Sequence, residues 1–588
     1  MTNPVSLINL LINYSPTKYA NVLQNQLQLL RRQLAYPKIS IQLSILGLLA
    51  GICASAFILA FRWVLENVQL LYLDNPDDFT SLNTFFHLIL PFIGIALIAL
   101  LGWFTDFKYF RLGIPFVIYR LKAFYGMMPM RNTINQFFGG IIAMSSGFSV
   151  GREGPAVHLG AGAASYLAAG LKLPYNSVRT LSACGMAAAI SASFNTPLAA
   201  VIFVMEVVLR EYKIHIFVPV MLASVAGATA NRFVFGHEHD LSTLDINLLG
   251  IQHYPYLVFM GVIVGCFAFA FNRQLIEIIR SFKYVNMIPR LALAATVTAI
   301  IGAIVPEALG IGLGAISIAQ QETGNAQLLM TVFISKAALT FFAIGLGIPG
   351  GIIGPILGLG MMLGTLLALM ASIFIGDVHD YADIYGVLGL AALMAACLNA
   401  PLAALVTALE MTYNPDIVVP AMLVIVCAHV VSSQIFRNRS LFLLQLETQK
   451  LDYQSPPTYD ILQKTGVLAA MTRNFILIKR KDDEALKRAL DRAGKRPVIL
   501  KEDHPDGTSF KLVNYNVSLD PLQNSPFSFE DLQGVESRYT LAEPYEILQD
   551  RRSGSVYIFA DQLDQIIGVI SWEQLRLRLT KGSYQVFE

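Results

Sequence analysis

The sequence predicts an all-α polytopic membrane protein built from two repeats of broken helices, followed by a small α/β domain. Three observations lead to this prediction. Hydrophobic residues make up 55% of the 588 residues and charged residues only 14%, with a mean hydropathy of +0.56. The apolar segments are interrupted by Gly, Pro and Asn, and their motifs recur in the second half of the chain. After residue 447 the composition becomes charged and no apolar span follows.

The first two apolar segments, residues 41–63 and 85–104, are long enough to cross the ~30 Å hydrocarbon core of a bilayer. Several of the segments that follow are too short to do so. Broken helices are tolerated at membrane depth only where they are buried in protein or line a cavity, so we expect them to surround an internal path. In the first half these segments are residues 135–150, 156–169, 177–191, 197–209 and 216–230. The second half repeats the scheme, with spans at residues 256–271, 290–304 and 328–344, followed by the segments 353–374, 384–396, 401–412 and 417–435.

The two halves match motif by motif. NTPLAA at residues 195–200 parallels NAPLAA at residues 399–404, and Glu206 stands at the same offset from Glu410. Four more residues recur 200 positions later: Gly151, Gly154, Pro155 and Gly160 match Gly351, Gly354, Pro355 and Gly360. Paired broken helices are typical of transporters whose substrate site lies near the midplane. We interpret Glu206 and Glu410, at matched helix ends, as capping or packing residues rather than ion contacts.

The stretch GREGP at residues 151–155 places two ionisable groups at membrane depth, where such groups are costly and mark functional sites. Pro155 suits the first turn of a helix, and the glycines beside Glu153 allow close approach of the backbone. The pattern predicts a helix that begins inside the membrane and offers its N–H groups to an anion. A carboxylate there can occupy the anion's own place. The alternative is a tight turn with an Arg–Glu pair.

The ends of the chain are polar. Residues 1–40 contain a predicted amphipathic helix, and Arg31, Arg32 and Lys38 before the first span place the N-terminus in the cytoplasm. No cleavable signal peptide is visible. All five cysteines lie in apolar segments without CxxC spacing, which indicates buried thiols rather than disulfides or metal ligands. Residues 448–588 contain two similar strand–helix–strand patterns, at residues 467–500 and 538–579, and predict a small cytoplasmic α/β domain.

These motifs resemble the CLC family of chloride channels and chloride/proton antiporters. GREGP is similar to the family's most specific signature, and GIPGGIIGP at residues 347–355 is similar to its GxPGGxxxP element. LGIP at residues 112–115 resembles its GSGIP element. The resemblance covers residues 41–447, with repeats at about 85–235 and 290–436. The tail resembles a tandem CBS (cystathionine-β-synthase-type) pair through RPV at residues 496–498 and GVIS at residues 568–571.

The resemblance implies inverted repeats whose helix N-termini converge on one anion path per subunit of a homodimer. Glu153 would be the gate, which opens the site when it is neutral or swung away and competes with chloride when ionised. Backbone amides of Arg152, Glu153 and Gly154 would form the outer anion site, and those of Ile352 and Ile353 the central one. The implied partners are chloride and the lipid bilayer, without nucleic acid or metal. The implied location is a bacterial plasma membrane, with both termini cytoplasmic.

Three positions depart from the family pattern. The central serine that contacts chloride falls at Leu112, directly before Gly113 and Ile114 in the same anion-binding element, and the tyrosine that supplies a second hydroxyl falls at Phe442. We therefore predict a weak central site held by backbone amides alone. The intracellular proton-transfer glutamate falls at Val207, which cannot titrate.

The missing acid favours a passive chloride channel gated by Glu153, and the alternative is a chloride/proton antiporter with a non-standard proton path. A fluoride exporter of the same family is less favoured because its signature differs. An intramembrane enzyme would need a nucleophile or clustered ligands, but the histidines form no HExxH motif and pair only at residues 237–239. The repeat argues against a ligand sensor. In the CBS-like tail the ribose-binding acidic position reads Gln574, so an adenine nucleotide and a ligand-free stabilising role both stay open.

Overall fold

The computed structural model describes residues 16–38, 40–107, 112–236, 249–375, 381–451, 453, 456–479, 482–494, 496–504, 507–515 and 527–581. The histidine pair at residues 237–239 lies outside these residues. The chain forms two compact units. The α/β unit contains Met1–Leu43, Ala169–Val178 and Ser455–Glu588, and the helical unit contains Ser44–Ala168 and Arg179–Gln454.

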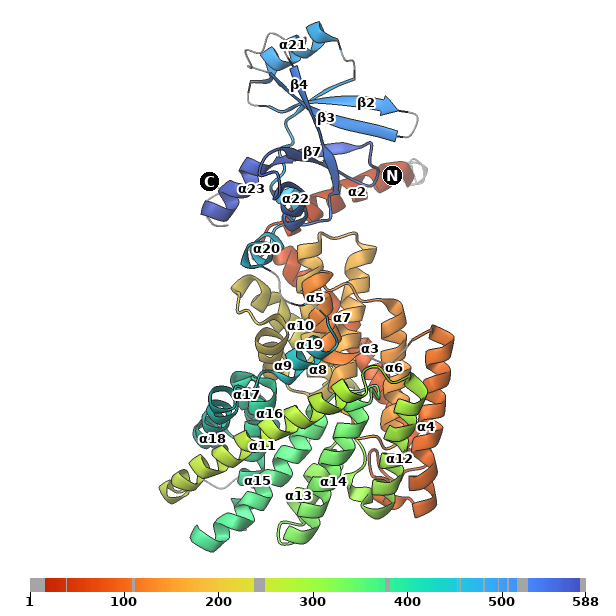
Figure 1. Cartoon of the computed structure of the whole chain (residues 1–588), viewed down its shortest axis with the longest axis vertical. Helices are drawn as coiled ribbons and strands as arrows, with labels where there is room; N and C mark the ends of the chain where they lie inside the picture. The colour runs from red at the N-terminus through yellow and green to blue at the C-terminus, as the bar shows by residue number, and fades with distance from the viewer. Residues whose placement is uncertain are drawn as a thin grey trace, which may run out of the picture. The chain divides into compact units, whose positions relative to one another are not determined.

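The helical unit is built from helices of very unequal length (Figure 1). Among the described residues, eight helices of the chain are long and apolar enough to cross a membrane. The first half contains α3 Ile41–Gln69, α4 Thr84–Thr105, α5 Gly113–Ala123, α6 Met130–Ser145, α7 Glu153–Gly170, α8 Tyr175–Phe194, α9 Pro197–Phe203, the π-helical turn η2 Val204–Leu209 and α10 Ile214–Phe235. The second half contains α11 Tyr254–Ser281, α12 Met287–Ile304, α13 Leu313–Gln321, α14 Ala326–Gly345, α15 Ile353–Ile375, α16 Ala382–Leu398, α17 Pro401–Thr412, α18 Val418–Val430 and α19 Leu441–Thr448.

The predicted apolar segments all coincide with helices, but several boundaries differ. Helix α3 continues six residues beyond the predicted end, because the Arg62–Glu66 ion pair at i,i+4 supports a polar last turn. Helix α6 ends at Ser145, five residues early, because Gly147 adopts a left-handed backbone (φ 80°). The short helices α5, α13 and α19 were not predicted as elements. Their apolar runs are too brief to give a periodic signal.

The repeat is visible in matched local conformations. Asn195 and Asn399 both adopt the left-handed region (φ 54° and 60°) before the helices α9 and α17, which each begin with proline. Helices also approach closely at matched glycines. A Cβ added to Gly185 would lie 2.2 Å from the Gly160 carbonyl oxygen, and one added to Gly389 would lie 2.4 Å from that of Gly360. Small residues let membrane helices pack backbone to backbone, so both repeats use the same contact between their corresponding helices.

Two carboxylates cap the short helices of the opposite repeat. Glu206 accepts hydrogen bonds from the N–H groups of Leu402 (3.2 Å) and Ala403 (2.6 Å) at the start of α17. Glu410 accepts the corresponding bonds from residues 198 (2.9 Å) and 199 (2.7 Å) at the start of α9. Each carboxylate satisfies otherwise unpaired N–H groups of a helix N-terminus. The predicted capping role of both residues is confirmed.

Replacing Glu206 by Ala should therefore destabilise the protein, because two N–H groups of α17 lose their acceptors. We expect a loss of about 1–2 kcal/mol in the free energy of unfolding, measured by thermal unfolding of the purified protein in detergent. Glu277→Ala is the matched control, since its side chain is 61% exposed and pairs weakly with Arg280. Equal stability of the two variants would contradict the capping role.

The α/β unit carries two small sheets (Figure 1). Its elements are α2 Pro16–Leu34, α20 Pro457–Leu462, β1 Ile476–Ile478, α21 Asp483–Ala493, β2 Val498–His504, β3 Gly507–Tyr515, β4 Phe527–Asp531, β5 Gln533–Glu536, α22 Ala542–Leu548, β6 Ser555–Phe559, β7 Ile566–Ser571 and α23 Trp572–Lys581. The sheets have the orders β1-β2-β3-β4 and β5-β6-β7. In each, the first two strands are parallel and the next pair antiparallel. This repeated β-α-β-β order is consistent with a CBS pair. Strands β3 and β4 were not predicted.

The α/β unit also includes α2 and the connection between α7 and α8. The Arg31 guanidinium donates to the Leu171 carbonyl through Nε (3.2 Å) and Nη2 (3.0 Å). The Gly466 N–H donates to the Ala35 carbonyl (2.9 Å), and Asn176 Nδ2 donates to the Leu34 carbonyl (2.9 Å). The amphipathic helix predicted near the N-terminus is therefore present as α2 and packs within this unit.

Candidate functional site

The glycine signatures of the two repeats meet in the middle of the helical unit. The Gly151 N–H donates to the Gly351 carbonyl (2.7 Å), and the Gly351 N–H donates back to the Gly151 carbonyl (2.6 Å). Helices α7 and α15 begin two residues after these glycines, at Glu153 and Ile353. Two helix N-termini, with their unpaired N–H groups and positive dipole ends, therefore converge at one point. The predicted helix start at GREGP, with Pro155 in the first turn, is confirmed.

The carboxylate of Glu153 lies among three signature glycines. A Cβ added to Gly151 would lie 2.1 Å from Glu153 Oε2, one on Gly351 would lie 2.6 Å from the same atom, and one on Gly354 would lie 2.9 Å from Oε1. The carboxylate accepts hydrogen bonds from its own N–H and from the Gly354 N–H. The side chain is 4% exposed, and Oε2 has no partner among the described residues. The carboxyl group of Glu153 therefore occupies the place where the helix N-termini would hold an anion.

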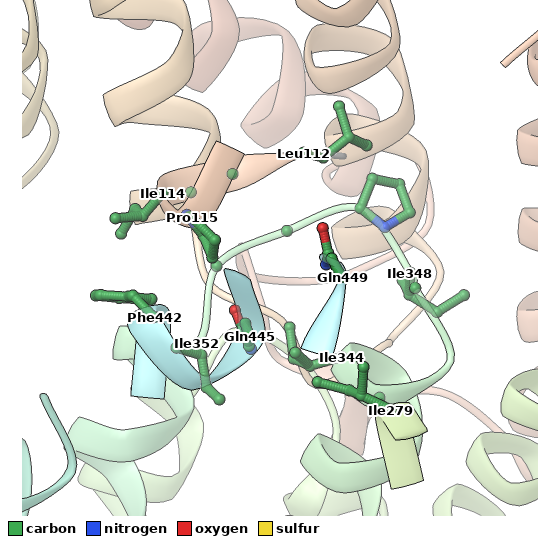
Figure 2. A pocket seen from close by; sticks show the side chains of 17 residues that line it. Leu112, Ile114, Pro115, Ile279, Ile344, Ile348, Ile352, Phe442, Gln445 and Gln449 are labelled. Atoms are coloured by element: carbon green, nitrogen blue, oxygen red, sulfur yellow. The ribbon is translucent and has the colours of Figure 1, made fainter. Parts of the chain in front are cut away.

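A cavity of about 70 Å³ is lined by Gly154, the residue after Glu153, and by Gly350 and Gly351 of the second repeat. Apolar side chains from several elements form most of its wall (Figure 2). The backbone around Gly113, Gly154 and Gly350 closes one end, since a Cβ on Gly154 would lie 2.6 Å from the Gly350 carbonyl oxygen. The lining residues are Leu112, Gly113, Ile114, Pro115, Gly154, Ile279, Ile344, Gly345, Gly347, Ile348, Pro349, Gly350, Gly351, Ile352, Phe442, Gln445 and Gln449. We call this space the anion vestibule.

The structure brings most of the predicted anion-binding residues together. Six of them line the anion vestibule: Leu112, Gly113, Ile114, Gly154, Ile352 and Phe442. The other three do not. The guanidinium of Arg152 lies over the ring of Phe194 at 4.6 Å, while Glu153 and Ile353 line a separate cavity. Val207 is buried in the turn η2 and lines neither cavity.

One backbone amide in the vestibule wall already has a protein partner. The Gly113 N–H donates to Gln136 Oε1 at 2.9 Å. Leu112, which precedes α5, makes no capping hydrogen bond through its side chain. The Gly113 N–H is therefore occupied by Gln136, and the central site formed by the amides of Ile352 and Ile353 stays a prediction. Sequence reasoning missed Gln136 because a buried glutamine on α6 has no motif.

Two glutamines of α19 and its C-cap supply polar groups that the sequence analysis did not identify. Gln445 and Gln449 follow Phe442 by three and seven residues and line the vestibule on the same side of the helix (Figure 2). Gln445 is 6% exposed as a residue, and it lines the vestibule. A carboxamide there can donate a hydrogen bond to an anion. The i, i+3, i+7 spacing after Phe442 was the signal that could have revealed both residues.

A second cavity of about 40 Å³ adjoins Glu153. Its lining is apolar apart from Glu153 and two hydroxyl groups, those of Thr196 and Thr407. Glu153 is the ionisable residue among its lining residues, which are Glu153, Val157, Ile190, Phe194, Thr196, Ala199, Phe203, Ile353, Leu357, Met394, Thr407 and Met411. This small cavity shares no lining residue with the anion vestibule.

Two buried charged side chains, those of Asp77 and Lys336, support the backbone behind the Glu153 carboxylate. Asp77 Oδ1 accepts a hydrogen bond from the Ile311 N–H (2.9 Å), and the Ile311 carbonyl oxygen lies 2.5 Å from a Cβ added to Gly354. Lys336 Nζ donates to the carbonyl groups of Leu309 (3.1 Å) and Gly310 (2.7 Å). Both charges therefore fix the loop that packs against Gly354. Asp77, which is buried in this loop's surroundings, was not identified from the sequence.

Comparison with known proteins agrees with this arrangement. The family model for voltage-gated chloride channels matches residues 104–433. The H⁺/Cl⁻ exchange transporter ClcA of Salmonella arizonae is 30% identical over 402 residues, which cover 65% of this chain and 82% of that protein. The crystal structure of a slow cyanobacterial Cl⁻/H⁺ antiporter has a TM-score of 0.62 at 20% identity and covers 70% of this chain and 99% of its own. A eukaryotic CLC transporter structure covers 93% of this chain and 98% of its own, with a TM-score of 0.57 at 18% identity.

Proposed function

The chain belongs to the CLC family, and from this premise we propose that it exchanges chloride for protons across the membrane, with Glu153 as the coupling group. It is a multi-pass membrane protein that transports chloride and is not an enzyme. The observation that carries the proposal is the position of the Glu153 carboxylate among Gly151, Gly351 and Gly354. An ionised carboxylate there excludes an anion from the meeting point of α7 and α15. A protonated Glu153 carboxyl group has no charge to hold it there, so an anion can displace it.

Exchange is favoured over passive conduction because Glu153 stands between two cavities. Gly154 lines the anion vestibule, and its neighbour Glu153 lines the small cavity together with Thr196 and Thr407. Chloride and protons can therefore reach Glu153 by different routes, with threonine hydroxyls available to hydrogen-bond water in the proton route. The relatives named as H⁺/Cl⁻ exchange transporters support this choice. A passive channel gated by Glu153 is the second candidate, favoured by Val207 at the proton-transfer position.

Chloride-driven proton movement tests the exchange directly. Purified protein in sealed lipid vesicles would be given an outward chloride gradient at equal pH on both sides. We expect protons to enter as chloride leaves, measured by external pH, with an ionophore for potassium holding the voltage near zero. Chloride efflux without proton movement would replace the proposal by the passive channel.

In the vestibule we propose that Gln445 provides the side-chain donor that Leu112 and Phe442 do not. Gln445→Leu keeps the volume of the side chain and removes its N–H groups. We expect chloride affinity to fall by roughly tenfold or more, the effect of about one hydrogen bond to a charged group, measured by isothermal titration calorimetry. Gln434→Leu, at an exposed glutamine outside the vestibule, should bind chloride normally. Equal affinity of both variants would show that Gln445 does not contact chloride.

Leu112→Ser should strengthen anion binding, because it places a hydroxyl group at the vestibule wall beside the occupied Gly113 N–H. We expect a several-fold gain in chloride affinity, the effect of about one added hydrogen bond, in the same calorimetric measurement. Leu112→Ala separates the hydroxyl from the loss of bulk. A serine variant that binds no better than the alanine variant would contradict our placement of Leu112 at the anion site.

We further propose a homodimer in the plasma membrane with both termini in the cytoplasm, as the family resemblance implies. Arg31, Arg32 and Lys38 before α3 support this orientation. Protease treatment of right-side-out and inverted vesicles should cleave the α/β unit only in the inverted ones. Mass measurement in detergent should give twice the mass of one chain.

A further inference from the structure

A cavity of about 110 Å³ lies inside the α/β unit and is rich in cations. Its wall is formed by α2, the connection between α7 and α8, and the segments around β5, β6 and β7. Its charged lining residues are Arg31, Arg32, Lys172, Glu536, Arg538 and Asp561. Cations outnumber carboxylates by two, so the cavity attracts anions. It is separate from the path around Glu153, which belongs to the helical unit.

The guanidinium groups in this cavity are held in place by backbone carbonyls. Arg31 donates to the Leu171 carbonyl, and Arg538 donates through Nε to the Leu173 carbonyl (3.4 Å) while its guanidinium lies over the ring of Tyr175 at 4.9 Å. Arg538 Nη2 is buried and has no hydrogen-bond partner among the described residues. A buried donor without a partner costs roughly 1–3 kcal/mol. The cavity therefore contains a fixed cationic donor that still lacks an acceptor.

The carboxylate of Asp561 only partly balances these cations. It accepts a hydrogen bond from Lys172 Nζ (2.6 Å), although its side chain is 69% exposed. The hydrogen bond and charge of Lys172, with smaller contributions from Arg31 and Arg538, hold the pKa of Asp561 below its usual value. Burial lowers the pKa of Arg31, as does repulsion from Arg538, while Asp561 opposes that lowering. An exposed ion pair contributes little stability, so a more highly charged anion can displace Asp561.

We propose that this cavity binds a phosphate-bearing ligand. Guanidinium groups match the oxygens of a phosphate in pairs, and several cations around one point suit its multiple charges better than a halide. Leu468, Met471 and Ile567 line the same cavity and offer an apolar surface to the group that the phosphate is attached to. A soluble nucleotide and a lipid headgroup share this chemistry.

The cavity differs from the ribose-binding position of a CBS pair, which falls at Gln574. The Gln574 carboxamide is engaged within the fold: Oε1 accepts from the Ser571 N–H (2.9 Å), and Nε2 donates to Thr472 Oγ1 (2.7 Å). Neither Gln574 nor Thr472 lines the cationic cavity. Variants of the cationic residues therefore distinguish the two sites.

Isothermal titration calorimetry on the full chain in detergent tests the proposal, with ATP, inorganic phosphate and a short-chain phosphatidylinositol phosphate as probes. We expect at least one probe to bind, and Arg538→Gln to weaken it by tenfold or more. Asp561→Asn should strengthen binding several-fold, because it removes the competing carboxylate. Binding of ATP but not of the lipid identifies a soluble ligand, and the reverse identifies a headgroup.

Arg551→Gln is the matched control, since Arg551 is exposed in the same unit and does not line the cavity. Thermal unfolding checks that each variant is folded. If Arg538→Gln unfolds the protein, two other variants replace it. Arg32→Gln should weaken binding of the probe, and Asp561→Asn should strengthen it. The proposal is overturned if no probe binds at millimolar concentration, or if binding is the same in the wild type and in the folded variants of Arg32, Arg538 and Asp561.

Discussion

Glu153→Gln should raise chloride flux at neutral pH by roughly tenfold, the factor that corresponds to about 1.4 kcal/mol of lost competition at the anion position. The amide has the shape of the acid but no charge to hold it at the converging N-termini of α7 and α15. It also cannot carry a proton, so chloride movement should no longer be coupled to protons. The flux should lose its pH dependence as well, whereas the wild type should become faster as the pH falls and the carboxylate is neutralised. Chloride efflux from vesicles at several pH values measures the flux and its pH dependence, and the external pH recorded in the same experiment measures the coupling.

Glu322→Gln is the control for this change, because Glu322 is exposed and lines neither cavity of the site. Its flux and pH dependence should match the wild type. A Glu153→Gln protein that keeps the wild-type pH dependence would remove Glu153 from its role as the gate.

Gly151→Ala should have nearly the same effect while leaving Glu153 in the chain. The three atoms nearest to a Cβ at Gly151 all belong to the Glu153 carboxyl group, at 2.1, 2.8 and 2.9 Å. Since that carboxyl group ends a flexible side chain, the methyl group should expel it from its place without moving the backbone. We expect a flux gain of the same order as for Glu153→Gln, roughly tenfold, and weak pH dependence, measured by the same efflux assay.

Two comparisons make this prediction specific. Gly170→Ala, at the end of the same helix, adds a methyl group with nothing within 4 Å and should leave transport unchanged. The double variant Gly151→Ala, Glu153→Gln should be no faster than either single variant, because both changes act on one group. Additive gains would mean that Gly151 affects transport by another route.

The recurrence of Gly151 and Gly154 as Gly351 and Gly354 was readable from the sequence, and so was the helix start at Glu153. A glycine in a motif indicates that a larger side chain would not fit at that position, but it does not identify the group that occupies the space. Only the structure shows that the space beside Gly151, Gly351 and Gly354 holds the carboxylate of Glu153. Long-range pairing between residues 200 positions apart has no local sequence signal, and the Gly151–Gly351 bridge therefore could not be foreseen.

The polar partners of the site were the least predictable part. Gln445 follows Phe442 by one helical turn, and a helical projection of α19 would have placed it on the same face. Gln136 occupies the Gly113 N–H through a contact between different helices, which no spacing rule predicts. The missing serine at Leu112 and the missing tyrosine at Phe442 predicted an apolar vestibule. The vestibule is more polar than that, because the carboxamides of Gln445 and Gln449 also line it.

The α/β domain was predicted as two strand–helix–strand units. At residues 467–500 that order is present as β1, α21 and β2, but at residues 538–579 it is wrong, because β6 and β7 are an antiparallel pair without a helix between them and the strand β5 precedes residue 538. The strands β3 and β4 escaped detection because their alternating residues are largely polar, as expected for a sheet with one solvated face. The assignment of α2 and the connection between α7 and α8 to the same compact unit depends on hydrogen bonds such as Arg31 to Leu171. Contacts across 140 positions of the chain are beyond pattern analysis.

The reversal potential in a planar bilayer, with equal chloride on both sides and a tenfold proton gradient, tests the exchange mechanism most directly. We predict that the wild-type reversal potential moves away from zero in the direction set by the proton gradient, and that Glu153→Gln returns it to zero. A wild-type reversal potential that stays at zero would contradict exchange and identify a passive chloride channel.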